Sequence, residues 1–259
     1  MKDNLKGELI AEFLGTALLC LLGDGVVATA TLFNAYSGQW HPSILWGLTV
    51  ALLVYIFGGV SGAHFNPAVT IAVGIFGGFP KNKIVPFIVA QVAGGFVGAA
   101  ALHALIGPKM AEYEAANNIV RSQASGLTTA KFFSCFANDG VGLGIAFFWE
   151  VVLTFMLLAI VFCIGEPRNG NMPKGGLGPM IVGLVVALAV GIGGPWTMAS
   201  LNPARDLGPR IWLAVAGWGA NAFPGPNGYF WVPSLGPIVG GIIAGAVWVY
   251  LVKPYLPKN

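Results

Sequence analysis

The sequence predicts an all-α membrane protein in which six transmembrane helices and two half-helices form two inverted repeats. The 259 residues are 56% hydrophobic and only 9% charged, whereas soluble domains carry about 25% charged residues. Six apolar runs approach or exceed the ~20 residues that cross ~30 Å of hydrocarbon. The tripeptide Asn-Pro-Ala also occurs twice, at 66–68 and 202–204, each time before a shorter apolar segment.

The first apolar run follows two lysines, as a signal peptide would. We interpret it as a retained helix because it is too long, contains Glu12 and shows no small-residue cleavage site. The six predicted spans are 8–33, 42–60, 84–106, 144–165, 178–195 and 230–252.

The segments near 66–78 and 203–215 are too short to span a membrane. Each begins with Asn, a favourable N-cap, followed by Pro, which is favoured at the first helical position. About ten helical residues measure ~15 Å, or half a bilayer. Two half-helices that meet tip to tip would therefore complete a seventh span.

The two halves of the chain repeat one another. Gly47 matches Gly183, Glu12 matches Glu150, and Gly94 matches Gly240. We divide the single channel domain, 1–259, into a first repeat at about 8–106, a connecting loop at 107–143 and a second repeat at about 144–252. Three spans in each repeat give the halves opposite orientations, so the two half-helices enter from opposite faces. Repeated, interrupted helices of this kind mark a binding site or a pore.

Basic residues predict the orientation. On a six-span model one side collects the following residues: Lys2, Lys6, Lys81, Lys83, Arg168, Lys174, Lys253 and Lys258. We assign this side to the cytoplasm, with both termini inside. The loop at 34–41 has no Lys or Arg and lies outside, together with the long 107–143 connection.

The centre of this arrangement has a definite polarity. Two helix N-termini carry roughly half a positive charge each, which repels cations and protons. The amides of Asn66 and Asn202 are expected to offer donors to a solute, and Arg205 to act as a further donor; a strut held by backbone carbonyls is its alternative role. Non-helical backbone before each motif offers carbonyl acceptors to the pore. These pore-lining backbone residues are Gly62, Ala63, His64, Phe65, Met198, Ser200 and Leu201.

Several buried polar residues are assigned to structural support. Glu12 and Glu150 are expected to accept hydrogen bonds from loop N–H groups, with a proton relay as the alternative. Asp24 either lines an outer vestibule or ends the first helix, and His64 is expected to bond to backbone. The net charge of +3 gives no reason to expect nucleic acid. The three cysteines form no disulfide framework or metal cluster in the sequence, so no cofactor or metal is predicted.

The stretch from Ser61 to Thr70, Ser-Gly-Ala-His-Phe-Asn-Pro-Ala-Val-Thr, and the later Asn-Pro-Ala-Arg-Asp resemble the major intrinsic protein family. Trp46, Asp206 and Arg210 resemble its aquaglyceroporin branch, which includes the bacterial glycerol facilitators. The resemblance covers essentially the whole chain. It implies the aquaporin-like fold, a homotetramer with one pore in each subunit, a bacterial inner (plasma) membrane and no enzymatic activity.

The same resemblance implies a selectivity filter of Trp46, Val190, Ala199 and Arg205, with Asp206 as structural support. The bacterial glycerol facilitators carry Gly and Phe where this chain has Val190 and Ala199. Neither position holds the His that narrows water-specific pores. We therefore expect a passive channel, at least as wide as a glycerol pore, that excludes protons and ions. Its expected solutes are glycerol, water, dihydroxyacetone, urea and protonated lactic acid.

Three alternatives remain at this point. A water-selective channel is disfavoured by Trp46 and Asp206. A secondary transporter would need coupling-ion ligands or a titrating relay at the midplane, where this chain places Asn and Arg. An intramembrane protease is suggested by Ser61 in a Gly-x-Ser-Gly string and by His103, but an unwound glycine-rich loop explains the same string.

Overall fold

Six long helices form the body of the molecule. The computed structural model describes residues 4–171 and 175–257, and no strand occurs in these residues. The long helices are α1 (Leu5–Phe33), α2 (Trp40–Ser61), α4 (Lys81–Ala116), α6 (Leu143–Ile164), α7 (Gly178–Thr197) and α9 (Val232–Val247). In the described part of the chain, six helical segments are long and apolar enough to cross a membrane. The predicted fold class is therefore confirmed, and the protein is a multi-pass membrane protein.

The two predicted half-helices are α3 (Pro67–Phe76) and α8 (Pro203–Val215). Each follows an Asn in extended conformation, whose Oδ1 accepts a hydrogen bond from the first turn. The distance from Ala68 N to Asn66 Oδ1 is 2.9 Å, and the distance from Ala204 N to Asn202 Oδ1 is also 2.9 Å. Pro occupies the first helical position in both, where its missing N–H costs nothing.

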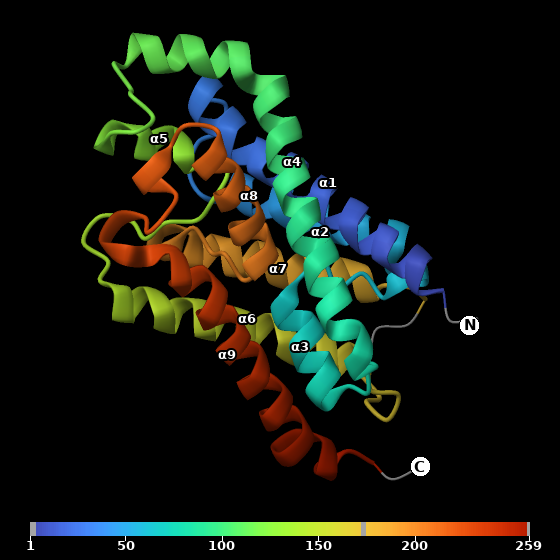
Figure 1. The fold of residues 1–259 in the computed structure, drawn as a ribbon. Coiled ribbons are helices and arrows are strands. Elements are labelled where there is room, and N and C mark those ends of the chain that lie inside the picture. The colour runs from blue at the N-terminus through green and yellow to red at the C-terminus, as the bar shows by residue number, and fades with distance from the viewer. Residues whose placement is uncertain (1–3, 172–174, 258–259) are drawn as a thin grey trace.

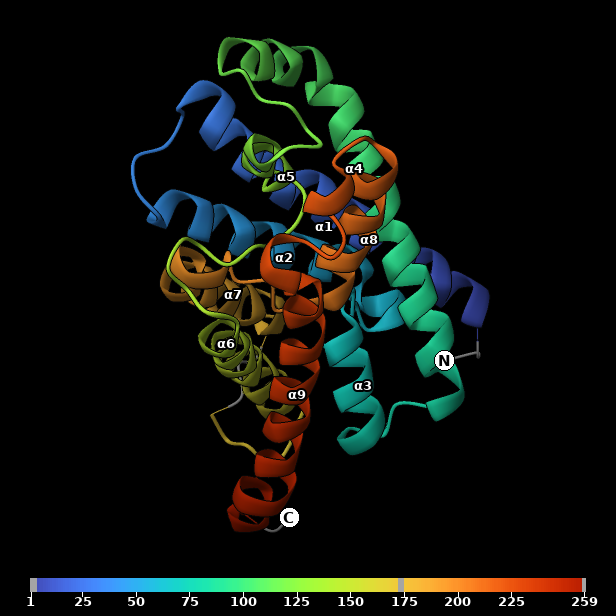
Figure 2. The same ribbon diagram turned by 60° about the vertical axis from the view of Figure 1, so that its left-hand side comes forward.

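The packing of the helices repeats between the halves (Figures 1 and 2). Helix α1 packs on α4, as α6 packs on α9, and α2 packs against α7. Each half-helix contacts the last long helix of the other half, so that α3 lies on α9 and α8 lies on α4. The repeats are therefore interleaved and do not form two separable bodies.

Glycines allow the closest helix contacts. A Cβ added to Gly47 would collide with the carbonyl oxygen of Gly183, and a Cβ added to Gly183 would collide with that of Gly47. Gly94 on α4 faces the Phe13 carbonyl in the same way, and Gly240 on α9 faces the Val151 carbonyl. Small residues let helix backbones approach this closely in lipid. The matched glycines of the two repeats thus mark matched contacts.

Buried apolar side chains form two clusters. One surrounds the centre of the bundle and includes Trp46, Leu153 and Val190. The other includes Phe133, Trp218 and Tyr229 and anchors the connection that was predicted as a loop at 107–143. Large exposed apolar side chains project from the outer helix faces, as expected of a surface in contact with lipid. They include Leu14, Leu22, Leu52, Val89, Leu105, Phe148, Leu188 and Leu251.

The connection between the repeats is more helical than predicted. Helix α4 continues past residue 106 to Ala116, although Pro108 lies inside it. A short segment at Ala124–Gly126 and α5 (Leu127–Ala130) follow. The predicted boundary was placed where the apolar run ends. Loss of hydropathy marks where a helix leaves the hydrocarbon, and a helix with polar pairs such as Lys109–Glu112 continues in water.

The start of α1 and the segment after α9 lie at the same end of the bundle as the start of α4 and the end of α6 (Figure 1). The predicted cytoplasmic residues Lys6, Lys81, Arg168 and Lys253 belong to these segments. Three others, Lys2, Lys174 and Lys258, lie outside the described residues. At the opposite end the chain connects α8 to α9 through short helical turns at Gly219–Asn221 and Pro226–Trp231. Beyond α9 the helix continues as a π-helical turn at Trp248–Val252.

Candidate functional site: a pore between the two repeats

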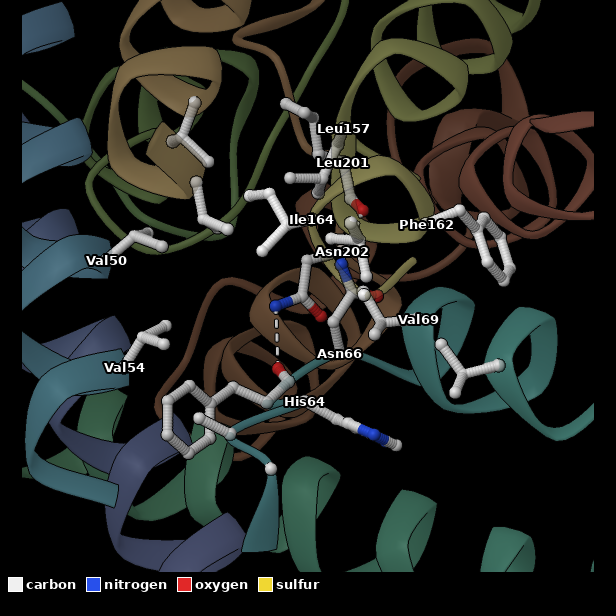
Figure 3. Close-up of a pocket in the computed structure, with 18 of the residues that line it drawn as sticks. Val50, Val54, His64, Asn66, Val69, Leu157, Phe162, Ile164, Leu201 and Asn202 are labelled. Carbon is white, nitrogen blue, oxygen red and sulfur yellow. Dashed lines mark hydrogen bonds between the residues drawn. The ribbon is translucent and has the colours of Figure 1, made fainter. Parts of the chain in front are cut away.

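A cavity of about 560 Å³ runs between the two repeats. One part of its wall is aliphatic, and another consists of loop backbone and polar side chains (Figure 3). The aliphatic side chains include Val50, Val54, Val69, Val73, Leu157, Val161, Val182 and Val186. The cavity therefore presents an apolar surface and hydrogen-bonding groups to the same solute.

Asn66 and Asn202 lie side by side at the centre of the cavity (Figure 3). The Nδ2 of Asn66 donates to the carbonyl of Leu201 at 2.8 Å, and the Nδ2 of Asn202 donates to the carbonyl of Phe65 at 2.8 Å. Each amide nitrogen carries two hydrogens, and this exchange uses one of them. The second hydrogen of each amide is available to a solute.

The loops before the half-helices border the cavity with their backbone. Helices α2 and α7 continue closer to the motifs than the sequence suggested, so the non-helical stretches are only Gly62–Phe65 and Met198–Leu201. Their conformation is unusual, because five residues that are not glycine have positive φ. The values are 51° for Ala63, 49° for Phe65, 62° for Met198, 51° for Ala199 and 53° for Leu201. Such backbone costs about 1–3 kcal/mol per residue, and the surrounding structure must hold it in place.

Glu12 holds the first loop. Its carboxylate is fully buried and accepts hydrogen bonds from His64 N at 2.9 Å and Phe65 N at 2.7 Å. The hydroxyl of Ser61 and the Nε2 of Gln91 donate to the same carboxylate at 2.6 and 2.7 Å. Four donors thus surround one side chain, and the donors belong to three different elements of the chain.

Glu150 has the matching position in the second repeat. It is fully buried and accepts from Ser200 N and Leu201 N, both at 2.9 Å, and from the hydroxyl of Thr197 at 2.6 Å. All of these contacts are with loop backbone or with the end of α7. Within the described residues, neither acid leads to a chain of titratable groups across the cavity, so their geometry is that of a support.

The four filter positions inferred from the resemblance all border the same cavity. Trp46, Val190, Ala199 and Arg205 are all buried. The guanidinium carbon of Arg205 lies 4.8 Å from the centre of the Trp46 ring, within reach of a cation–π contact. The carbonyl of Val190 accepts a hydrogen bond from Gln39 Nε2 at 3.0 Å, which fixes α7 to the start of α2.

Two expectations about single residues were wrong. Asp24 neither lines a vestibule nor ends a helix: it is buried within α1, and its Oδ1 lies 3.2 Å from Arg205 Nη2. The ring of His64 pairs with the hydroxyl of Thr70 at 3.1 Å, not with backbone. The pore-lining role of Met198 stays a prediction: its carbonyl lies 3.7 Å from Cys135 Sγ, and its side chain packs against the apolar cluster of Phe133, Trp218 and Tyr229.

Asp206 supports α8 from the side. It is fully buried, and Arg210, one turn along the same helix, donates to both of its oxygens at 2.8 Å. The backbone N–H of Cys135 donates to Asp206 Oδ1 at 2.9 Å. This network fastens the connection between the repeats to the half-helix that carries Arg205.

The mouth of the cavity beside the segment after α9 holds a charged group that could not be predicted from the sequence. Glu166 borders the cavity together with Lys253. Its carboxylate lies 2.9 Å from Arg168 Nε and 3.0 Å from Lys253 Nζ. These two cations, Arg168 first, lower the pKa of Glu166 to about 2. Arg168 and Lys253 were noted only as markers of orientation, because nothing in the sequence places residues 166 and 253 together.

A membrane-spanning helix bundle with two half-helices and a two-faced cavity between them defines a channel protein. The model of the major intrinsic protein family matches residues 1–250, and the chain belongs to that family.

Individual relatives extend over nearly the whole chain. The chain is 43% identical over 257 residues to the glycerol uptake facilitator protein of Escherichia coli K12, covering 98% of this chain and 91% of that protein. It is 41% identical over 261 residues to the propanediol uptake facilitator of Citrobacter freundii, covering 100% and 97%. The solved structure of the aquaglyceroporin from Plasmodium falciparum superposes with a TM-score of 0.85 at 30% identity, covering 97% of this chain and 98% of that one.

Proposed function

We propose that this protein is a passive channel for glycerol and other small uncharged solutes, together with water. The observation that carries this proposal is the two-faced cavity. A polyol has hydroxyl groups along one edge and carbon atoms along the other. The aliphatic wall suits the carbon edge, while loop carbonyls and the amides of Asn66 and Asn202 suit the hydroxyls. The descriptions of the relatives from E. coli and C. freundii support the same solute class.

Exclusion of ions and protons follows from the centre of the pore. The N-termini of α3 and α8 meet there, as the exchanged hydrogen bonds of Asn66 and Asn202 require. Their partial positive charges oppose cations, and the two amides donate to a passing oxygen without accepting its proton. A proton therefore cannot pass through this point along a row of hydrogen-bonded hydroxyl groups.

The filter is the part of the proposal that sets the range of solutes. Val190 and Ala199 replace the Gly and Phe of the bacterial glycerol facilitators, so the wall is aliphatic where those proteins have an aromatic ring. We propose that dihydroxyacetone, urea, protonated lactic acid and propane-1,2-diol also pass. The likeness to a propanediol uptake facilitator supports the last of these.

The alternatives are less well supported. A transporter that alternates between two states must move its repeats past one another, whereas here their centres are joined by two buried hydrogen bonds. A serine protease needs a base beside its nucleophile. Ser61 instead donates to Glu12, and the ring of His103 contacts Trp212 and Arg121. A water-selective pore is the alternative that the experiment below must separate.

We also propose that the protein forms a homotetramer in a bacterial plasma membrane, with both termini in the cytoplasm. The basic residues at one end of the bundle support the orientation, and family membership supports the assembly. Native mass spectrometry from detergent is expected to give a mass four times that of one 26.9 kDa chain. A monomer under conditions that preserve a known tetrameric channel would contradict this part.

The decisive experiment is stopped-flow light scattering on proteoliposomes, with water, glycerol and propane-1,2-diol compared under imposed osmotic gradients. Fast, non-saturating glycerol flux without any ion gradient is expected. Arg205→Gln should change the ratio of glycerol to water permeability, because Arg205 is the charged donor at the filter. Water flux alone would show that Val190 narrows the pore and would reject glycerol as a solute. Flux that needs a proton or sodium gradient would reject the channel.

A further inference from the structure

Asp24 is a buried acid that has no role in the channel as described so far. It lies within α1 with no exposed surface, and it does not border the cavity. Its Oδ1 is 3.2 Å from Nη2 of Arg205, which does border the cavity. The carboxylate therefore touches the filter arginine from outside the cavity.

The contact is electrostatic and differs from the other buried ion pair of the same half-helix. Arg210 makes two hydrogen bonds of 2.8 Å to Asp206 and two more to the carbonyls of Ala222, at 3.1 Å, and Cys135, at 2.7 Å. In contrast, neither oxygen of Asp24 nor Nη1 of Arg205 has a hydrogen-bond partner among the described residues. Arg210 is fixed as a strut, whereas Arg205 is held at its place chiefly by charge and by Trp46.

The neighbour of Asp24 shapes the other filter residue on this side. A Cβ added to Gly23 would collide with the ring of Trp46, so the lack of a side chain there lets the ring lie against α1. The ring then lies across the guanidinium of Arg205. Two consecutive residues of α1 thus position two of the four filter side chains.

We infer that Asp24 is a positioning residue of the selectivity filter, acting through Arg205. The inference rests on the proposed filter. A carboxylate and a guanidinium at 3.2 Å form a pair without net charge. The filter therefore offers solutes a hydrogen-bond donor, the Arg205 guanidinium, whose positive charge is compensated by Asp24. The same attraction holds the guanidinium against α1 and keeps the width of the pore free for the solute.

Asp24→Asn removes the charge and keeps the shape. The unpaired guanidinium is then expected to turn toward the cavity, which contains the water that can solvate it. The ratio of glycerol to water permeability should fall at least about twofold, the lower limit of coupling for side chains in contact. Nitrate flux, measured in the same liposomes, should rise because the filter gains net positive charge. Thr16→Val, which removes a buried polar group from α1 away from the filter, should leave both quantities unchanged.

The Arg205→Gln background separates this inference from the proposed filter. If Asp24 acts through Arg205, adding Asp24→Asn to Arg205→Gln changes neither the solute ratio nor nitrate flux. An unchanged ratio in the single Asp24→Asn variant, or an equal change in both backgrounds, would overturn the inference. If Arg205→Gln itself has no effect on selectivity, the filter assignment fails first.

Poor folding of Asp24→Asn would also be informative. Breaking a buried pair leaves one charge uncompensated, whereas removing both partners does not. The double variant Asp24→Leu/Arg205→Leu is therefore expected to recover the folded yield lost in Asp24→Asn, measured by size-exclusion chromatography. Failure of the double variant to recover that yield would assign Asp24 a role independent of Arg205 and would overturn the inference.

Discussion

At the scale of single residues, two acids hold backbone that would not keep its conformation alone. Glu12 and Glu150 each accept hydrogen bonds from two consecutive loop N–H groups. The loops contain residues with positive φ that are not glycine, and the carboxylates compensate for that strain. Because each acid is buried, no water replaces it when it is lost. These contacts make the two acids sensitive positions.

Glu150→Gln is expected to lower the free energy of unfolding by about 1–3 kcal/mol. The amide keeps one acceptor oxygen and places an NH2 group where the other carboxylate oxygen accepted a backbone N–H bond, so one buried loop donor loses its partner. Thermal unfolding in detergent measures the change. Glu112→Gln is the matched control, because Glu112 is exposed beside Lys109 and its loss should cost less than about 1 kcal/mol. Equal unfolding temperatures for the two variants would contradict the supporting role of Glu150.

Ala199→Phe tests the width of the filter. Ala199 borders the cavity, and a ring at this position would reduce the space for the carbon atoms of a solute. Permeability to a four-carbon polyol such as erythritol should fall at least about fivefold, since overpacking costs about 1–3 kcal/mol. Glycerol permeability should fall less. Ala199→Ser, which adds one atom, is the control, and an equal loss for both polyols would argue against a steric filter at this residue.

At the scale of the elements, close approach of helices sets where the half-helices can lie. The contact of α2 with α7 is shared equally by the two repeats, because Gly47 and Gly183 each face the other's carbonyl. Both helices continue into the loops that border the pore. A change in the distance between α2 and α7 is therefore expected to move the loops that border the pore.

Gly47→Ala is expected to destabilise the protein by about 1–3 kcal/mol relative to Gly59→Ala. Both glycines lie in α2, so the gain in helix propensity cancels in the comparison. The added Cβ at position 47 meets the Gly183 carbonyl, whereas the space around Gly59 is open. Unfolding temperatures of the two variants check the difference. If they unfold alike, the close contact of α2 and α7 contributes nothing to stability.

At the scale of the whole molecule, the cavity mouth at Glu166 and Lys253 joins parts of the chain that are distant in sequence. Glu166 follows α6, and Lys253 follows the π-helical turn after α9. Their ion pair fastens the C-terminal segment to the cavity rim. The group is charged throughout the physiological range, because the pKa of Glu166 is lowered to about 2.

This pair predicts a loss of stability in acid. The pKa of Glu166 is lower in the folded protein than its ordinary value of 4.5, so its contribution is complete above about pH 4.5 and disappears as the pH falls toward 2. Glu166→Gln has no such titration. The difference in unfolding temperature between wild type and Glu166→Gln should therefore shrink over this pH range. A constant difference would show that the carboxylate charge does not matter at this site.

Much of the fold could be predicted from the sequence because the thickness of the hydrocarbon layer fixes the length of a membrane-spanning helix. Apolar runs gave the six spans, and Asn66-Pro67 and Asn202-Pro203 gave the half-helix starts, since capping depends on adjacent residues. The ion pair of Asp24 with Arg205 could not be predicted, because it joins positions 24 and 205 across two helices. The side-chain partner of His64 was missed for a similar reason, because it depends on packing that a linear pattern does not record. The extension of α4 to Ala116 was missed because hydropathy marks where a helix leaves the hydrocarbon and not where it ends.

The exchanged hydrogen bonds at the centre also bear on how the protein is made. Asn66 donates to a carbonyl that the ribosome adds 135 residues later, which at roughly 5–20 residues per second takes on the order of ten seconds. Glu12, in contrast, finds its loop partners within the first repeat. The first half can thus insert and fix its own loop early, but its central amide waits for the second half. The centre of the pore is therefore completed only once the second repeat has been made, well after the first loop is fixed.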